Sequence, residues 1–318
     1  MKRREILSAA LFVAILAGFV WALSLYFLPK DNTAEAGIQN VRPNGFLSEP
    51  ENSLDYVIFG DSIPLVGISP LEIWKNWGYT GYDCVDTGQN AEMSAILLEH
   101  VLERQTPKVV FMETNHLYKG YSAEDILTLR LERAVPVLQY HDNWKFLKPA
   151  QALRPVNYTL DVQGKGFYLR KLIVGTDPGD YMAPSDYNDP LPEQSCRSLE
   201  RIAELCREKG VQLVLVSVPS PVNWNDACHR AVAGVADSMN VPYLDLNLVD
   251  IGIDWSQDTM DAGDHLNITG TVKVCAYLGE YLADTGLMKD KRLDPAFDGW
   301  NRDVADFEAA AATVEDAL

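Results

Sequence analysis

The stretch Tyr56-Val57-Ile58-Phe59-Gly60-Asp61-Ser62 decides the fold of this chain. Its β-forming apolar residues predict a buried strand, and Gly-Asp-Ser then places a hydroxyl at the carboxyl end of that strand. Open α/β sheets bind their ligands at this edge. Much later, the cluster Asp261-Ala262-Gly263-Asp264-His265 offers an imidazole flanked by carboxylates, which is the type of base that activates a serine. The two stretches together indicate acyl-transfer chemistry.

Strand-like and helix-like segments alternate after this first strand. Continuous apolar strands separated by helices predict a mainly parallel sheet that is covered on both faces. We therefore expect an α/β fold, a three-layer α/β/α sandwich of flavodoxin-like type. The further strands are expected at 82–85, 108–112, 211–218 and 241–246, and the main helices at 91–104, 195–209, 226–239 and 268–284.

The N-terminus carries a basic cluster, Lys2-Arg3-Arg4, followed by an almost uncharged segment over residues 6–28. As a helix this segment measures about 34 Å, which is enough to span a bilayer. Basic residues on its amino side predict a signal-anchor with residues 1–5 in the cytoplasm and the remainder outside the plasma membrane. The alternative is a cleaved signal peptide, for which Ala34-Glu35-Ala36 offers a small-residue site, but the apolar segment is longer than such peptides usually have.

Composition narrows the classes of partner and cofactor. A net charge of −18 argues against nucleic acid, because phosphate binding depends on clustered Lys and Arg. The five cysteines are scattered without zinc-like spacing, and the histidines share no ligand spacing, so we expect neither a metal nor a disulfide framework. The sequence has no glycine-rich phosphate loop, and no cofactor is expected.

Changes in composition also suggest the domain boundaries. Residues 29–53 are polar without an apolar periodicity and predict a linker. Residues 54–286 form the expected catalytic domain, in which an aromatic, Pro- and Asp-rich insert at about 117–192 predicts either a lid or docking surface or a poorly ordered segment. The acidic residues 287–318 predict a solvated tail with one weak helix near 305–314.

The order of these motifs resembles the SGNH (GDSL-type) hydrolase superfamily. Phe59-Gly60-Asp61-Ser62 matches the first block of that family, which implies that Ser62 is the nucleophile and that its backbone N–H serves the oxyanion hole. Residues 85–92 fall where the second block belongs, with Ala91 in place of the oxyanion glycine. Residues 109–116 fall at the third block, where Asn115 matches the oxyanion asparagine.

The chain departs from the family pattern at two blocks. Glu113 and His116 replace the usual residues of the third block, and we regard them as possible substrate contacts. The last block normally reads Asp-x-x-His, but Ala262 lies three residues before His265. Asp261 is therefore the preferred residue to orient the imidazole, with Asp264 as the alternative.

Membrane-anchored SGNH proteins of similar layout act in teichoic-acid D-alanylation and polysaccharide O-acetylation. The resemblance implies, in a bacterium, a serine esterase or O-acyltransferase that acts on acyl esters of cell-envelope glycans, with a multi-pass membrane acyltransferase as a further partner. A catalytically silent scaffold that binds polysaccharide or such an acyltransferase is the alternative. Neither the acyl group nor the choice between hydrolysis and transfer follows from the sequence.

Overall fold

The structure is a computed structural model that describes residues 3–145, 150 and 154–313. Lys2, residues 146–149 and 151–153 of the insert and residues 314–318 of the tail lie outside this description. The centre of the fold is a five-stranded parallel sheet in the order β2-β1-β3-β4-β5. The strands are β1 (Tyr56–Phe59), β2 (Gly81–Asp83), β3 (Val109–Glu113), β4 (Gln212–Ser217) and β5 (Tyr243–Asp245). The predicted parallel α/β sheet is thus confirmed.

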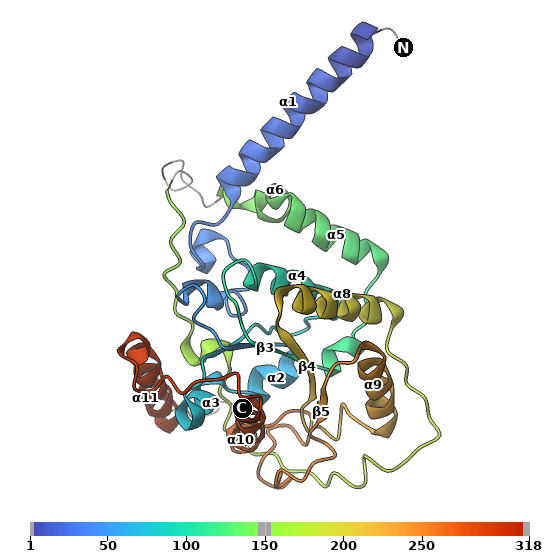
Figure 1. Ribbon diagram of the computed structural model, residues 1–318, viewed down its shortest axis with the longest axis vertical. Coiled ribbons are helices and arrows are strands. Elements are labelled where there is room, and N and C mark those ends of the chain that lie inside the picture. Colours follow the sequence, from blue (N-terminus) through green and yellow to red (C-terminus); the bar gives the residue numbers. More distant parts are fainter. Residues whose placement is uncertain (1–2, 146–149, 151–153, 314–318) are drawn as a thin grey trace.

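Helices cover both faces of this sheet (Figure 1). Alternate residues of each strand point to opposite faces, so Val57 and Phe59 pack with one group of helices while Tyr56 and Ile58 pack with the other. The first group comprises α4 (Ala91–Val101), α8 (Glu193–Lys209) and α9 (Asp226–Met239), and the second comprises α2 (Ser62–Gly67), α3 (Pro70–Trp77) and α10 (Ile268–Asp284). The three predicted layers are present.

The chain order of the sheet positions the site. β1 has β2 on one side and β3 on the other, so the connections that leave β1 and β3 diverge at the carboxyl ends of these neighbouring strands. Such a topological switch point opens a crevice in open α/β sheets. Ser62 follows β1 and Asn115 follows β3, so both residues lie at this crevice.

An N-terminal helix, α1 (Arg3–Phe27), projects from the sandwich (Figure 1). Its apolar window has a mean hydropathy of 2.5 and is 0% buried inside the protein, and among the described residues it is the one helix long and apolar enough to cross a membrane. Exposure of so many apolar side chains to water is unfavourable, so we expect α1 to contact lipid or another protein. The helix therefore fits the expected membrane span in length and composition.

The predicted linker at 29–53 is packed against the domain, which corrects the sequence interpretation. Phe46 and Leu47, in the 3-10 turn η2 (Gly45–Ser48), are 0% and 2% exposed and belong to the core. Asn32 is also buried and exchanges two hydrogen bonds with the backbone of Leu160, at 2.8 and 2.9 Å. Two apolar residues without a periodic pattern were enough to dock the segment, so periodicity could not reveal it.

The acidic tail is also docked, and its helix is longer than expected. α11 (Asp298–Thr313) follows the short turn η6 (Pro295–Phe297) and buries Trp300 and Phe307, which lie seven residues apart on one helix face. Lys165, in the turn η5 (Gln163–Gly166), pairs with Asp303 at 2.7 Å. The high acidic content concealed this apolar face, so the prediction of a solvated tail is wrong for α11.

Candidate active site

The serine sits at a tight strand-to-helix turn. Ser62 is the first residue of α2, and Asp61 caps this helix by accepting a hydrogen bond from the Ile63 N–H at 3.0 Å. Gly60 is required by close approach, because a Cβ there would lie 2.5 Å from Pro64 Cγ and 3.0 Å from Glu113 Cβ. Asp61 thus has a structural role as a helix cap, and the turn presents the Ser62 side chain at the edge of the sheet.

A closed loop carries the carboxylate and the imidazole. Thr259 and Leu266 pair as an antiparallel bridge, and the Met260 N–H donates to the His265 carbonyl at 3.1 Å. Between them the chain reverses through two left-handed residues, Ala262 at φ 59° and Gly263 at φ 98°. This reversal turns Asp261 back toward His265. The α10 cap that follows, Asn267, accepts hydrogen bonds from the backbone N–H groups of Thr269 and Gly270 and so fixes the end of this loop.

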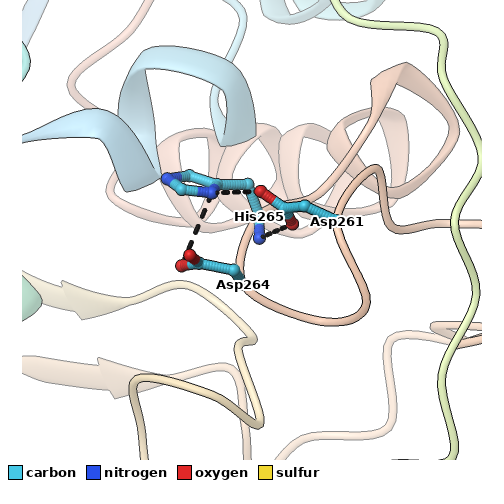
Figure 2. A group of neighbouring side chains, drawn as sticks. All are labelled: Asp261, Asp264 and His265. Atoms are coloured by element: carbon cyan, nitrogen blue, oxygen red, sulfur yellow. Dashed lines mark hydrogen bonds and ion pairs between the residues drawn. The ribbon is translucent and has the colours of Figure 1, made fainter. Parts of the chain in front are cut away.

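The structure brings Ser62, His265 and Asp261 together in one hydrogen-bonded chain. His265 Nε2 lies 2.9 Å from Ser62 Oγ, and His265 Nδ1 lies 2.7 Å from Asp261 Oδ2. Asp261 Oδ1 also accepts the His265 backbone N–H at 2.6 Å. Figure 2 shows the Asp261 carboxylate in contact with both the ring and the backbone N–H of His265, with the other ring nitrogen directed toward α2. A nucleophile, a base and a residue that orients the base are the parts that acyl transfer requires.

Asp264 is the weaker partner of the imidazole. Its Oδ1 lies 3.4 Å from His265 Nδ1, and Figure 2 shows it below the ring, whereas Asp261 lies beside the ring. The same oxygen accepts a 2.5 Å hydrogen bond from the amide of Asn223, which lies in the loop after β4. This bond holds the Asp264 carboxylate in place. Asp261, Asp264 and His265 offer ligand atoms within 4.8 Å of one another, so a cation would have to compete with these bonds for them. The geometry favours Asp261 as the orienting residue.

The proposed oxyanion donors lie at the same edge. Asn115 donates from Nδ2 to Asp61 Oδ2 at 3.2 Å, and Lys119 Nζ pairs with that same oxygen at 3.0 Å. An amide nitrogen carries two hydrogens, so one stays available to a substrate oxygen. Ala91 opens α4, where the first N–H groups have no partner within the helix. Lys119 carried no motif, so its support of Asp61 was not predicted.

Glu113 and His116 are buried behind Asn115 and do not face a substrate. Their side chains are 1% and 0% exposed, and they bond internally: Glu113 Oε1 accepts the Asn115 N–H at 2.9 Å, and His116 Nε2 lies 3.2 Å from Ser94 Oγ. Burial raises the pKa of Glu113 well above its usual value and lowers the pKa of His116 to about 4, so both are held in their neutral forms. The prediction that they contact substrate is corrected: they support the strand that carries Asn115.

Part of the insert is bound along the catalytic loop. The Val174 N–H donates to the Thr259 carbonyl at 3.0 Å, and the Ala262 N–H donates to the Val174 carbonyl at 2.9 Å. On either side of these bonds, Tyr168 N–H bonds the Leu65 carbonyl and Ile268 N–H bonds the Arg170 carbonyl, both at 2.8 Å. The insert therefore contributes a wall beside the triad, and its role as a lid or docking surface stays a prediction.

Comparisons with known proteins give resemblances of shape only. No family model matches the sequence, and the search of curated proteins returned no match. Among solved structures, a GDSL-like lipase from Bacteroides thetaiotaomicron shares 14% identity at a TM-score of 0.40, covering 78% of this chain and 97% of its own. A lipase/acylhydrolase from Enterococcus faecalis shares 12% identity at 0.38, covering 73% and 96%. A psychrotrophic esterase from Pseudoalteromonas sp. shares 11% at 0.38, covering 72% and 99%. At TM-scores of this size the likeness does not indicate a function.

Proposed function

We propose that this chain is an SGNH-type serine ester hydrolase or O-acyltransferase, anchored in the membrane by α1. The observation that carries the proposal is the chain of contacts from Ser62 Oγ through His265 to Asp261, at 2.9 and 2.7 Å. Ser62 and His265 come from segments 203 residues apart, so no local structure requires them to meet. A serine half-exposed at a sheet edge and paired with a carboxylate-bound imidazole is suited to nucleophilic attack.

The proposed reaction follows from these positions. His265 Nε2 takes the Ser62 proton as Oγ attacks the ester carbonyl, and Asp261 stabilises the resulting imidazolium. The backbone N–H groups of Ser62 and Ala91 and the Asn115 amide would bind the oxyanion. His265 then protonates the leaving alcohol, which leaves an acyl-Ser62. A second alcohol or water gives its proton to His265 and attacks the acyl carbon. As the acyl–Oγ bond breaks, His265 returns the proton to Ser62 Oγ, which restores the serine.

The proposed substrate class rests on the expected position of the catalytic domain relative to the membrane. α1 has the length and composition of a membrane span, and the basic residues before it favour a catalytic domain on the outer side. An enzyme held there meets acylated envelope glycans, and we propose these as donors or acceptors, with a multi-pass membrane acyltransferase as a partner in the transfer reaction. Transfer requires a sugar hydroxyl to outcompete water at acyl-Ser62.

The test uses the full chain in detergent with a fluorophosphonate probe. We expect the native chain to be labelled and Ser62→Ala to be unlabelled, with Ser69→Ala, a buried helix-capping serine, retaining the label. A native chain that stays unlabelled beside a reactive control hydrolase would favour the silent-scaffold alternative. Acetylated and D-alanylated glycans, followed by mass spectrometry of the Ser62 peptide, then identify the acyl group.

A further inference from the structure

The helix α5 (Ala123–Ala134) exposes two of its leucines on the outside of the protein, while Ile126 and Leu129 are partly buried. Leu127 and Leu131, one turn apart on one face, are 58% and 45% exposed, and Leu138 in α6 (Pro136–Tyr140) is 47% exposed. None of the α5 side chains is buried. A surface helix of a soluble domain normally turns its apolar face inward. This helix therefore has the orientation expected for a helix that contacts an apolar surface outside the domain.

Charged residues fix that orientation. On the inner side of α5, Arg130 Nε donates to Glu92 Oε1 of α4 at 2.7 Å, and Arg133 pairs with Glu103. Glu92 is 0% exposed, so rotating α5 to bury its leucines would withdraw one of the cations that compensate a buried carboxylate. The ion pairs hold the leucines outward.

The outward face adjoins the end of the candidate membrane span. The Val137 N–H of α6 donates to Ser24 Oγ in the last turn of α1 at 3.3 Å, and the Asn143 amide donates to the Phe27 carbonyl at 3.0 Å. Trp144, the next residue in the turn η4 (His141–Lys145), is 64% exposed. Figure 1 shows α5 and α6 as the layer of the body nearest α1, with α4 and α8 beneath them. If α1 crosses a bilayer, this layer meets the bilayer surface.

We infer that α5, α6 and Trp144 lie in the interfacial layer of the bilayer that α1 spans, with the leucines directed toward the acyl chains. The inference rests on the membrane anchoring in the proposed function. Three observations select lipid as the occupant: α6 packs against the end of α1, where Leu25 is exposed, the exposed residues include a tryptophan, which favours this layer, and the face is apolar in a chain of net charge −18. Contact of this kind does not depend on anionic lipids.

The experiment uses the full chain in phosphatidylcholine nanodiscs, with a photoreactive benzophenone amino acid replacing one leucine at a time. The test position is Leu131, the positive control is Leu16 in α1, and the negative control is Leu293, which is 97% exposed in the loop before η6. We expect phospholipid adducts at Leu16 and Leu131, with a yield at Leu131 about tenfold or more above that at Leu293. Raising the salt concentration should leave the yield unchanged.

Each other outcome overturns the inference in a distinguishable way. Adducts at Leu16 without adducts at Leu131 would show that α1 is in lipid while α5 is not, and crosslinks from Leu131 to a second chain would show that protein covers the face. A chain without adducts at Leu16 would refute the anchor itself. Thermal unfolding of each variant reports folding, and fluorophosphonate labelling of Ser62 reports the proposed chemistry separately. Leu127 replaces Leu131 if the latter variant does not fold.

Discussion

Asp261→Asn and Asp264→Asn should differ sharply in their effect on Ser62 reactivity. Asp261 contacts both the ring and the backbone of His265, at 2.7 and 2.6 Å, whereas Asp264 lies 3.4 Å from the ring and is held by Asn223. An asparagine at position 261 can accept a hydrogen bond but cannot stabilise the imidazolium, and it permits the wrong tautomer. The first variant therefore disables the base, and the second changes only its surroundings.

The size of the effect follows from exposure. Replacing a buried orienting aspartate costs about 10⁴ in rate, or about 5.4 kcal/mol at about 1.36 kcal/mol per factor of ten. The Asp261 side chain is 36% exposed, so water screens part of its interaction with the imidazolium. We therefore expect a loss of about 10²–10³ for Asp261→Asn, and less than about tenfold for Asp264→Asn.

The assay is the second-order rate of fluorophosphonate labelling of the full chain at neutral pH, with thermal unfolding of each variant as the folding control. A larger loss in Asp264→Asn than in Asp261→Asn, with both variants folded, would refute the assignment. Equal small losses would show that the imidazole needs neither carboxylate, and the proposed mechanism would then lack its orienting residue.

Three further substitutions test a buried ion pair, the pH dependence of stability and the backbone strain of the catalytic loop. Lys165→Leu removes the cation that pairs with the buried Glu49 carboxylate and should cost about 3–5 kcal/mol in urea unfolding, whereas Lys75→Leu breaks an exposed pair and should cost less than about 1 kcal/mol. His116 has a folded-state pKa of about 4, below the unfolded value of 6.5, so the unfolded state binds more protons between these values and stability should fall as pH falls through them; His116→Gln should reduce this slope in melts at pH 7 and 5. Gly263→Ala adds a contact of 2.7 Å to left-handed strain and should slow Ser62 labelling, while Gly286→Ala, with open space, should cost only about 1–2 kcal/mol of stability.

Local patterns predicted the sheet, because strands and caps depend on neighbours in sequence, whereas the order of distant motifs and their resemblance to the SGNH superfamily pointed to Ser62, His265 and Asp261. Apolar runs located the strands within a few residues, and Gly60-Asp61-Ser62 gave the strand-to-helix turn. The choice of Asp261 over Asp264 was a preference in the sequence, and it now has a geometric reason. Its catalytic consequence stays a prediction.

The features that sequence did not reveal depend on tertiary contacts. Lys119 and Asn223 act by reaching Asp61 and Asp264 from other loops, which no spacing encodes. The sequence did not predict α5, because Leu127 and Leu131 face outward and the helix lies in a segment that was expected to be irregular. The buried Glu113 and His116 resembled surface ligands only because polar residues at a strand end are usually exposed.

The packing of residues 31–53 fixes the position of Ser62 relative to the end of α1. A free tether would let Ser62 sample a wide range of heights above the membrane, but Asn32, Phe46 and Leu47 fasten this segment to the domain. The distance between the end of α1 and the reactive serine is then a constant of the fold. If α1 spans a membrane as proposed, acyl donors and acceptors would have to come to Ser62 at that one height.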